Sequence, residues 1–385
     1  MKTKDVLILS AIDPTRAYSC IKYLCSYLHM NKIDVELWSN VPVQSINEYK
    51  KWDIDTFSYL ECIFGRIPKI RTYYKKIIGI KRAYAYKNKV IICHDLFHYK
   101  ACVEVKQKYP DTQLILYFTE IFTDKSSPLQ KRLQKYFLKY PNMMDYMIEC
   151  DYCREMYRKR ENGVAKYSNT ILNTIPYDEL KDAIEIPRSE NYRPIIVYSG
   201  GIHTPGEFDI IIDAIKDIDL DFEMLFICFG NQEAIDDLQT KCKKYLSGRY
   251  RIETNKTREQ VFKSIRNADI GIVYYDPEYS INTLYAAPTK FYEYVGLNIP
   301  VVCSKNESLE KIIQNYGLGQ VMQKNNSNGM KKAILRLLED KTYRESVSQN
   351  EKKAFEENLC YEKQSQEGIN KLLSIISINK GEKKI

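Results

Sequence analysis

Short hydrophobic runs alternate along the chain with longer amphipathic stretches. In the first half these runs cover residues 6–11, 34–39, 90–95, 114–119, 146–150 and 169–173. The stretches between them, such as Ala17 to Met30, place apolar residues three and four apart and therefore predict helices. Continuous apolar strands joined by helical crossovers are typical of a parallel sheet that is covered by helices on both faces.

The same alternation starts again after a polar segment. Its hydrophobic runs cover residues 195–199, 223–229, 249–254, 270–275 and 299–303. The preceding segment, 181–193, contains Pro187 and charges of both signs, which favours a linker between two domains. The pattern predicts an α/β protein with two Rossmann-like, doubly wound parallel-sheet domains, at 1–180 and 194–361, that face a cleft. A C-terminal helix at 362–385 is expected to pack back on the first domain.

The segment 286–302 combines a helix, a turn and a strand. Pro288 suits a helix start because its missing N–H needs no partner there, and Gly296 suits a left-handed helix end. Lys290 and Glu293 lie on a different side of this helix from its apolar stripe. The N–H groups of the helix start and the lysine would attract phosphate, and the carboxylate would accept hydrogen bonds from ribose hydroxyls. The alternative is a surface helix with an ordinary Lys–Glu ion pair.

Two consecutive glycines, Gly200 and Gly201, follow the first strand of the second half. Glycine lets a backbone come close to a ligand phosphate, with the next helix start behind it. The order does not fit G-x-G-x-x-G, which disfavours a nicotinamide-type dinucleotide site. A tight strand-to-helix turn would need glycine as well. Since parallel strands end at one edge of a sheet, however, we expect the glycines and Lys290 to converge on one anion.

Polar residues also mark strand ends in the first half. They are Asp13 to Arg16, His94, Asp95 and Glu120. Ligands of doubly wound sheets bind outside the carboxyl ends of the strands, and an imidazole or carboxylate there can orient or deprotonate an acceptor hydroxyl. The alternative for each residue is a loop position that caps the following helix.

The composition is that of an ordinary globular protein, since 44% of the 385 residues are hydrophobic and 28% are charged. The formal net charge is +8, and residues 65–89 contain lysines, arginines and tyrosines but no Asp or Glu. Such a segment fits an anionic membrane surface. Residues 125–140 are likewise rich in lysine and arginine. A solvated basic face is the alternative. Nucleic acid is not an expected partner, because no recognition motif accompanies the charge.

The 11 cysteines are scattered through the predicted strands and helices, as expected for small buried residues in a reducing compartment. Cys150 and Cys153 form a C-x-x-C pair, for which a redox dithiol is the alternative; without a second pair nearby, a zinc site is not expected. Asp5 and Asp13 bracket the N-terminal apolar run too closely for a signal peptide, and no run approaches the roughly 20 residues of a membrane span. We therefore expect a cytoplasmic protein.

Segments of the second half occur in an order and spacing that match one enzyme family. They are Tyr198 to Ile202, Phe226 to Gly230, Asn267 to Ile272, and Pro288 to Tyr294 followed by Pro300 to Val302. With them, the second half resembles the nucleotide-sugar-binding domain of GT-B glycosyltransferases, in particular the family 4 type used for surface polysaccharides. The first half is similar to the acceptor domain of that family through Ile91 to Asp95, Tyr117 to Glu120 and Ile171 to Pro176.

The resemblance implies roles for individual residues. Glu293 matches the second glutamate of the family's E-x7-E signature, which holds the nucleotide ribose. Gly200 and Gly201 match the loop that faces the diphosphate, and Lys290, with Thr289 beside it, would neutralise that diphosphate.

The sequence also departs from the family. Tyr285 occupies the position of the first glutamate of E-x7-E, so the group that this glutamate supplies near the transferred sugar is missing or comes from elsewhere. Where relatives carry Arg and Lys near the glycines, this chain has Ile202, His203 and Thr204. His203 would contact a phosphate or the sugar, or is a solvated turn residue. A catalytically inactive homologue is the alternative to simple variation.

The resemblance implies a hexosyltransferase-type glycosyltransferase in surface polysaccharide biosynthesis, such as that of capsule or lipopolysaccharide. It would move a sugar from a nucleotide-diphosphate donor to a lipid-linked or oligosaccharide acceptor, with retention of configuration. Domain 194–361 would bind the donor. Domain 1–180 would bind the acceptor, with His94, Asp95 and Glu120 as the candidate catalytic residues.

The expected location is the inner face of the plasma membrane, held peripherally through residues 65–89. No metal or other cofactor is expected, because the fold requires none. Two alternatives stay open. A sugar-nucleotide 2-epimerase has a similar two-domain architecture but would need several carboxylates and histidines around the donor sugar. An inactive partner subunit would instead support an active transferase.

Overall fold

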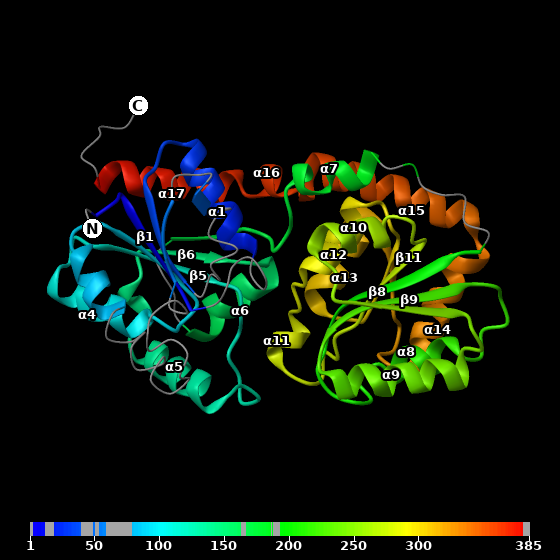
Figure 1. Cartoon of the computed structure of the whole chain (residues 1–385). Coiled ribbons are helices and arrows are strands. Elements are labelled where there is room, and N and C mark those ends of the chain that lie inside the picture. The colour runs from blue at the N-terminus through cyan, green and yellow to red at the C-terminus, as the bar shows by residue number, and fades with distance from the viewer. Residues whose placement is uncertain are drawn as a thin grey trace. The chain divides into compact units, whose positions relative to one another are not determined.

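The structure is a computed structural model of the chain, and it describes residues 3–11, 19–39, 49–50, 54–58, 79–162, 167–185, 187 and 193–379. The chain divides into two compact units. One is formed by Met1–Asn173 with Ser365–Ile385, and the other by Thr174–Gln364. Each unit contains a parallel sheet with helices packed around it (Figure 1). The predicted α/β class with two doubly wound parallel sheets is therefore confirmed.

Within the described residues, the sheet of the first unit has seven parallel strands in the order β3-β2-β1-β4-β5-β6-β7. The strands are β1 Val6–Ser10, β2 Val35–Ser39, β3 Asp55–Ser58, β4 Val90–His94, β5 Gln113–Phe118, β6 Tyr146–Glu149 and β7 Tyr167–Thr170. Every residue of β1 and β4 is buried, because these strands are covered on both faces. The strand order reverses between β1 and β4, which makes their carboxyl ends the switch point of this sheet.

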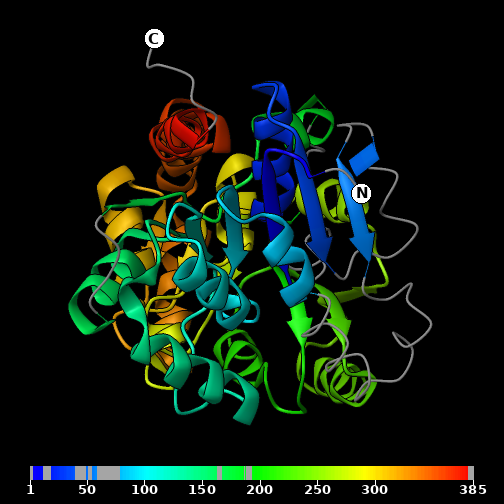
Figure 2. The ribbon, with the colours of Figure 1, turned by 90° about the vertical axis from the view of Figure 1, so that its left-hand side faces the viewer.

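The helices of the first unit lie on both sides of its sheet. Those whose bounds lie within the described residues are α1 Ser19–Met30, α4 Tyr99–Lys108, α5 Pro128–Lys139, α6 Tyr152–Asn162 and α17 Gln366–Asn379, with a 3₁₀ turn η1 Pro141–Met143. The last helix, seen end-on in red in Figure 2, packs against β7. Gly368 permits this contact because a side chain there would press on Ile171, and the hydroxyl of Tyr146 donates to the carbonyl of Gly368 at 3.1 Å.

The sheet of the second unit has six parallel strands in the order β10-β9-β8-β11-β12-β13. They are β8 Ile195–Ile202, β9 Glu223–Gly230, β10 Tyr250–Thr254, β11 Ile270–Val273, β12 Val301–Cys303 and β13 Gly319–Val321. The order reverses between β8 and β11, so residues that follow these two strands meet at the switch point of the second sheet.

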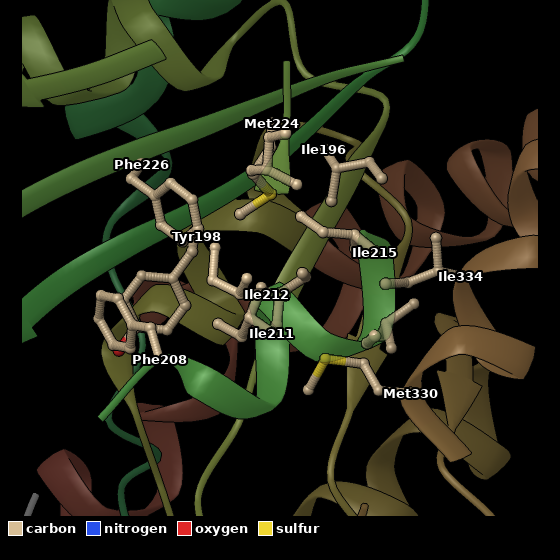
Figure 3. Packing of buried hydrophobic residues seen from close by; sticks show 14 of the residues in the cluster. Ile196, Tyr198, Phe208, Ile211, Ile212, Ile215, Met224, Phe226, Met330 and Ile334 are labelled. Carbon is tan, nitrogen blue, oxygen red and sulfur yellow. The ribbon is translucent and has the colours of Figure 1, made fainter. Parts of the chain in front are cut away.

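The helices of the second unit are α7 Tyr177–Glu185, α8 Asp209–Ile215, α9 Gln232–Tyr245, α10 Arg258–Ile265, α11 Ile281–Leu284, α12 Thr289–Gly296, α13 Glu307–Tyr316, α14 Ser327–Glu339, α15 Lys341–Ala354 and α16 Tyr361–Gln364, with a π-helical turn η2 Phe355–Leu359. Figure 3 shows the core between α8, α14 and the sheet, where Ile212 and Ile334 lie among the side chains of β8 and β9. Each fully buried side chain of this size contributes about 1.5–3 kcal/mol to folding.

Two predicted boundaries differ from the structure. Residues 181–185 of the expected linker are helical, because they belong to α7, in which Leu180 and Ala183 are buried. The exposed charged side of α7 gives this segment its linker-like composition. The expected C-terminal helix at 362–385 consists of two elements, since α16 belongs to the second unit and α17 to the first.

The helix end at Gly296 also differs from the prediction. Gly296 lies inside α12, and the left-handed residue that follows the helix is Asn298, with φ of 57°. Glycine is required at 296 for another reason. A Cβ atom there would collide with side-chain atoms of Leu180 and Phe355. The glycine therefore allows close packing of α12 rather than a change of chain direction.

Candidate active site

The glycine pair lies within β8, at the carboxyl edge of the second sheet. Gly200 and Gly201 pair with Cys228 and Phe229 of β9, so the strand continues to Ile202. The strand was predicted to end at Ser199, before the glycines, and pairing with β9 instead extends it past them. Gly200 has φ of 153°, a conformation that side chains rarely adopt.

Lys290 lies on α12 and directs its ammonium group to Gly200. A Cβ atom at Gly200 would lie 2.5 Å from Lys290 Nζ, so the glycine leaves the space that the lysine uses. The same nitrogen lies 4.0 Å from the ring centroid of Tyr198 and 5.5 Å from that of Tyr275. Burial lowers the pKa of Lys290 to about 8, although Glu293 acts in the opposite direction. This poorly solvated cation would gain from an anionic ligand.

The first turn of α12 begins beside this lysine. Its N-cap is Pro288, which has no side-chain hydrogen bond to offer to the N–H groups of Thr289 and Lys290. A helix start without a capping side chain favours an anion. The second unit thus brings Gly200, Thr289 and Lys290 together at one edge of its sheet.

Glu293 has a partner that the sequence did not indicate. Its Oε1 lies 3.0 Å from Nη1 of Arg258, the first residue of α10, and its side chain is only 9% exposed. Arg258 Nε also donates to Glu179 Oε2 at 3.1 Å. The ion pair of Glu293 thus joins α10 and α12, while the ammonium of Lys290 lies over the ring of Tyr198; the alternative of a Lys–Glu pair along α12 is not what the structure has.

Tyr294 fixes α12 against the glycine strand. Its hydroxyl oxygen accepts a hydrogen bond from the backbone N–H of Ser199 at 2.7 Å and lies 3.0 Å from Ser199 Oγ. Its ring lies flat against Gly271, where a Cβ atom would approach Cδ2 to 2.5 Å. In the sequence, Tyr294 was noted as the last residue of the family segment Pro288 to Tyr294. Its hydroxyl gives β8 and α12 a fixed relative position directly beside Gly200.

The loop between β8 and α8 is organised by Glu207. Its Oε2 accepts the backbone N–H groups of His203, at 2.6 Å, and Thr204, at 3.2 Å. The N–H groups of His203 and Thr204 are therefore hydrogen-bonded within the loop. The exposed side chain of His203 lies against Gly201, since a Cβ atom there would be 3.1 Å from His203 Nε2.

Tyr285, which stands where the family has its first glutamate, is 6% exposed and ends α11. The loop before it is held by Asn306, whose side-chain amide donates to the carbonyls of Tyr275, at 3.1 Å, and Thr283, at 2.5 Å. Ser304 Oγ accepts from the backbone N–H of Tyr275 at 2.9 Å. These contacts place Tyr275 beside Lys290.

In the first unit, His94 and Asp95 are each 1% exposed at the end of β4. His94 Nδ1 lies 2.8 Å from Ser10 Oγ, and Nε2 lies 3.0 Å from Thr119 Oγ1. Thr119 Oγ1 donates to Asp95 Oδ2 at 2.8 Å, and Asp95 Oδ1 accepts the N–H groups of Thr119, at 2.9 Å, and Glu120, at 3.3 Å. The ends of β1, β4 and β5 are thereby tied together.

The donors and acceptors of this network define one proton arrangement. Since Thr119 donates to Asp95, it accepts from His94 Nε2–H, which leaves Nδ1 to accept from the Ser10 hydroxyl. Burial lowers the pKa of His94, which agrees with a neutral ring. His94 and Asp95 thus shape the loop that carries Glu120, which is half-buried. Asp13 to Arg16 lie outside the described residues.

A second buried cluster supports the same loop. Arg154 Nη1 donates to the carbonyl of Thr119 at 2.6 Å, and Arg158 Nη2 donates to that of Glu120 at 3.1 Å. Arg158 Nε also pairs with Glu149 Oε2 at 2.6 Å, and its guanidinium lies 3.6 Å from the ring centroid of Phe118. Burial raises the pKa of Glu149 to about 7, while Arg158 opposes the shift. Sequence reasoning missed both arginines, which lie on α6.

Cys150 and Cys153 are both buried free thiols. Burial raises the pKa of Cys150, and its thiol donates to the carbonyl of Thr119 at 3.7 Å. A protonated, buried sulfur is a poor nucleophile, so the geometry favours a packing role over a redox dithiol.

In the described part of the chain, no three His, Cys, Asp or Glu side chains form a group that could hold a metal ion. No helix in that part is long and apolar enough to cross a membrane.

Residues 181–354 match the family model described as glycosyl transferases group 1. A search of curated proteins gives no match. Among solved structures, a glycosyltransferase from Rickettsia africae is similar at 12% identity, with a TM-score of 0.68, over 98% of this chain and 99% of that one. HepE of Anabaena, solved with UDP-glucose, is similar at 11% identity and a TM-score of 0.73, over 96% and 99%. The lipopolysaccharide outer core galactosyltransferase WaaB is similar at 11% identity and a TM-score of 0.65, over 96% and 98%.

Proposed function

We propose that the chain, whose residues 181–354 match the glycosyl transferases group 1 model, is a nucleotide-sugar glycosyltransferase with the GT-B fold. It moves a sugar from a nucleoside diphosphate to a lipid-linked glycan in surface polysaccharide biosynthesis, with retention of configuration. The observation that carries the proposal is the meeting of Lys290 Nζ, the start of α12 and Gly200 at the switch point of the second sheet.

The donor side works by electrostatics. A departing diphosphate gains negative charge as the sugar leaves, and Lys290 and the first-turn N–H groups of α12 stabilise that charge. Gly200 lets the diphosphate approach the backbone of β8. Glu293 accepts hydrogen bonds from the ribose hydroxyls. Support comes from HepE, which is solved with UDP-glucose on the same fold.

The acceptor side uses the carboxyl edge of the first sheet. Of the three expected residues, His94 and Asp95 are committed to the buried network, so Glu120 is the group that orients or deprotonates the acceptor hydroxyl. Arg154, Arg158 and Asp95 hold its backbone. The lipid-linked acceptor is supported by the name of the similar WaaB, a lipopolysaccharide galactosyltransferase, and by the basic surface described below.

The test is a panel of nucleotide sugars, with free nucleotide release and sugar isomerisation measured in the presence and absence of glycan acceptors. We expect one donor to release its nucleoside diphosphate. The Glu293→Gln variant should lose about tenfold in kcat/KM, roughly one charged hydrogen bond. Isomerisation without release would indicate an epimerase. No turnover by a folded, nucleotide-binding chain would indicate a partner subunit.

Helix α5 supplies a basic surface in the described part of the first unit. Lys131, Arg132, Lys135 and Lys139 are exposed together with Leu129 and Leu138, and the helix contains no acidic residue. In the predicted membrane segment 65–89, by contrast, Arg82 is paired with Glu36, and Lys89 Nζ donates to the carbonyl of Lys4. Residues 65–78 lie outside the described residues. Segment 65–89, in which Lys81 and Lys87 are exposed, stays a prediction, and we propose that α5 binds the same membrane surface.

Reversing the charge of Lys131, Arg132 and Lys135 to Glu should weaken binding to vesicles that contain phosphatidylserine by at least 100-fold, at about 1 kcal/mol for each basic residue removed. Co-sedimentation at low and high salt measures this. The matched control is charge reversal of Lys243 and Lys244, which are exposed on α9 of the second unit. Equal binding of the α5 variant and this control would contradict the proposal.

A further inference from the structure

Glu293 and its cation come from different helices. The carboxylate is almost buried, on α12, and the guanidinium of Arg258 lies 3.0 Å from it, at the start of α10. Among the described residues, Glu293 makes its ion pair with Arg258, while Lys290, one turn earlier on α12, faces the ring of Tyr198 at 4.0 Å. Arg258 thus pairs with the Glu293 carboxylate, whereas Lys290 lies over the ring of Tyr198.

Arg258 is itself held in place from several sides. Its Nε donates to Glu179 on α7 at 3.1 Å, and its guanidinium lies 4.9 Å from the ring centroid of Phe262 on α10. Its Nη1 is left to face Glu293. A guanidinium donates along fixed directions in one plane, so fixing one edge of the group fixes the direction of the other. The orientation of the Glu293 carboxylate therefore follows from that of Arg258.

We propose that Arg258 is a positioning residue for the nucleotide ribose. It holds Glu293 Oε1, so that the carboxylate faces the ribose hydroxyls in one orientation, and it cancels the charge of Glu293 close to an anionic diphosphate. Without Arg258, an almost buried carboxylate would repel the diphosphate and turn freely. This inference rests on the proposed function, because it takes Glu293 to be the ribose-binding group.

The experiment compares ribonucleoside diphosphates with their 2′-deoxy forms by calorimetric titration of the full chain. The probes are the uridine, guanosine, adenosine and cytidine diphosphates, so neither the sugar nor the acceptor has to be known. The wild type should bind the ribose form about tenfold more tightly than the deoxy form, as expected for a hydrogen bond to a carboxylate. Arg258→Met should bring that ratio close to one, and Arg258→Lys should restore part of it.

The ratio separates positioning from a purely structural role. If Arg258 only linked the helices, Arg258→Met would change the thermal stability and leave the ratio of ribose to deoxy affinity unchanged. If Arg258 contacted phosphate directly, the variant would bind both forms more weakly by the same factor. Either result overturns the inference. Lys263→Met is the matched control, since it removes an exposed cation from the same helix, paired with Glu259, and should leave the preference unchanged.

The wild type alone tests the premise. A wild type that binds no nucleoside diphosphate would overturn the proposed function and, with it, the inference. A wild type that binds without any ribose preference would overturn the inference and the ribose role of Glu293, and would leave the proposed sugar transfer in place.

Discussion

Replacing Lys290 with methionine should weaken the binding of a nucleoside diphosphate by about 10- to 100-fold, the range of one hydrogen bond to a charged group. Methionine keeps the length and the apolar stem of the side chain but removes the ammonium group that lies beside Gly200. The backbone of β8 and the start of α12 would remain in place. Calorimetric titration of the full chain measures the change.

The same titration should depend on pH in a defined direction. The pKa of Lys290 is about 8 in the ligand-free protein, and a bound diphosphate would raise it. The affinity should therefore fall as the pH rises above about 8, by at most tenfold for each pH unit. Lys290→Met should lack this part of the profile. The control is Lys263→Met, an exposed lysine on α10 that is paired with Glu259. Identical pH profiles of Lys290→Met and wild type would contradict the assignment.

Replacing Arg158 with methionine should lower the free energy of unfolding of the first unit by about 3–5 kcal/mol. Arg158 is 1% exposed and Glu149 is 0% exposed, so the substitution leaves a buried carboxylate without the guanidinium that binds it. Urea unfolding can be followed by tryptophan fluorescence, because Trp38 is buried in β2 of this unit and the sequence of the second unit contains no tryptophan. Replacing Glu149 and Arg158 together by methionine should recover much of the loss.

The loss of unfolding free energy in Arg158→Met should also grow as the pH rises. Burial raises the pKa of Glu149 from 4.5 to about 7, so the folded state holds this proton more tightly than the unfolded state. The stability that the raised pKa of Glu149 contributes is therefore fully present below about pH 4.5. It is lost as the pH rises through about 7. Without Arg158 the shift increases, and the deficit should be larger at about pH 8 than at about pH 5. Arg160→Met, an exposed arginine on the same helix, should cost less than about 1 kcal/mol. A similar cost for both variants would contradict the prediction.

The sheets could be predicted because a strand buried on both faces requires a continuous apolar run. The strands β1, β4, β5 and β8 all begin within a residue of the predicted positions. β3 and β13 were missed, since Asp55–Ser58 and Gly319–Val321 contain no such run. The length of β8 was also missed, because pairing with β9 decides whether two glycines continue a strand or turn.

The candidate site was predictable only where its residues share a local motif. Lys290 and Glu293 lie on one helix, so the sequence places them together. Arg258 is separated from Glu293 along the chain, and no local pattern indicates that α10 and α12 bring them within 3.0 Å. Likewise, the sequence places His94 and Asp95 at a strand end. It does not show that both side chains turn inward, because that depends on Thr119 of the neighbouring strand.

The buried cysteines provide a way to time the opening of each sheet. All ten that the structure describes are buried, including Cys93 and Cys102 in the first unit and Cys242 and Cys303 in the second. A thiol reagent can reach such a sulfur only while the surrounding structure is transiently open. In a chain in which Cys62 is replaced by serine, the labelling rate at each cysteine would therefore report the local opening free energy of its unit. A bound nucleotide should slow labelling of the second unit and leave that of the first unchanged.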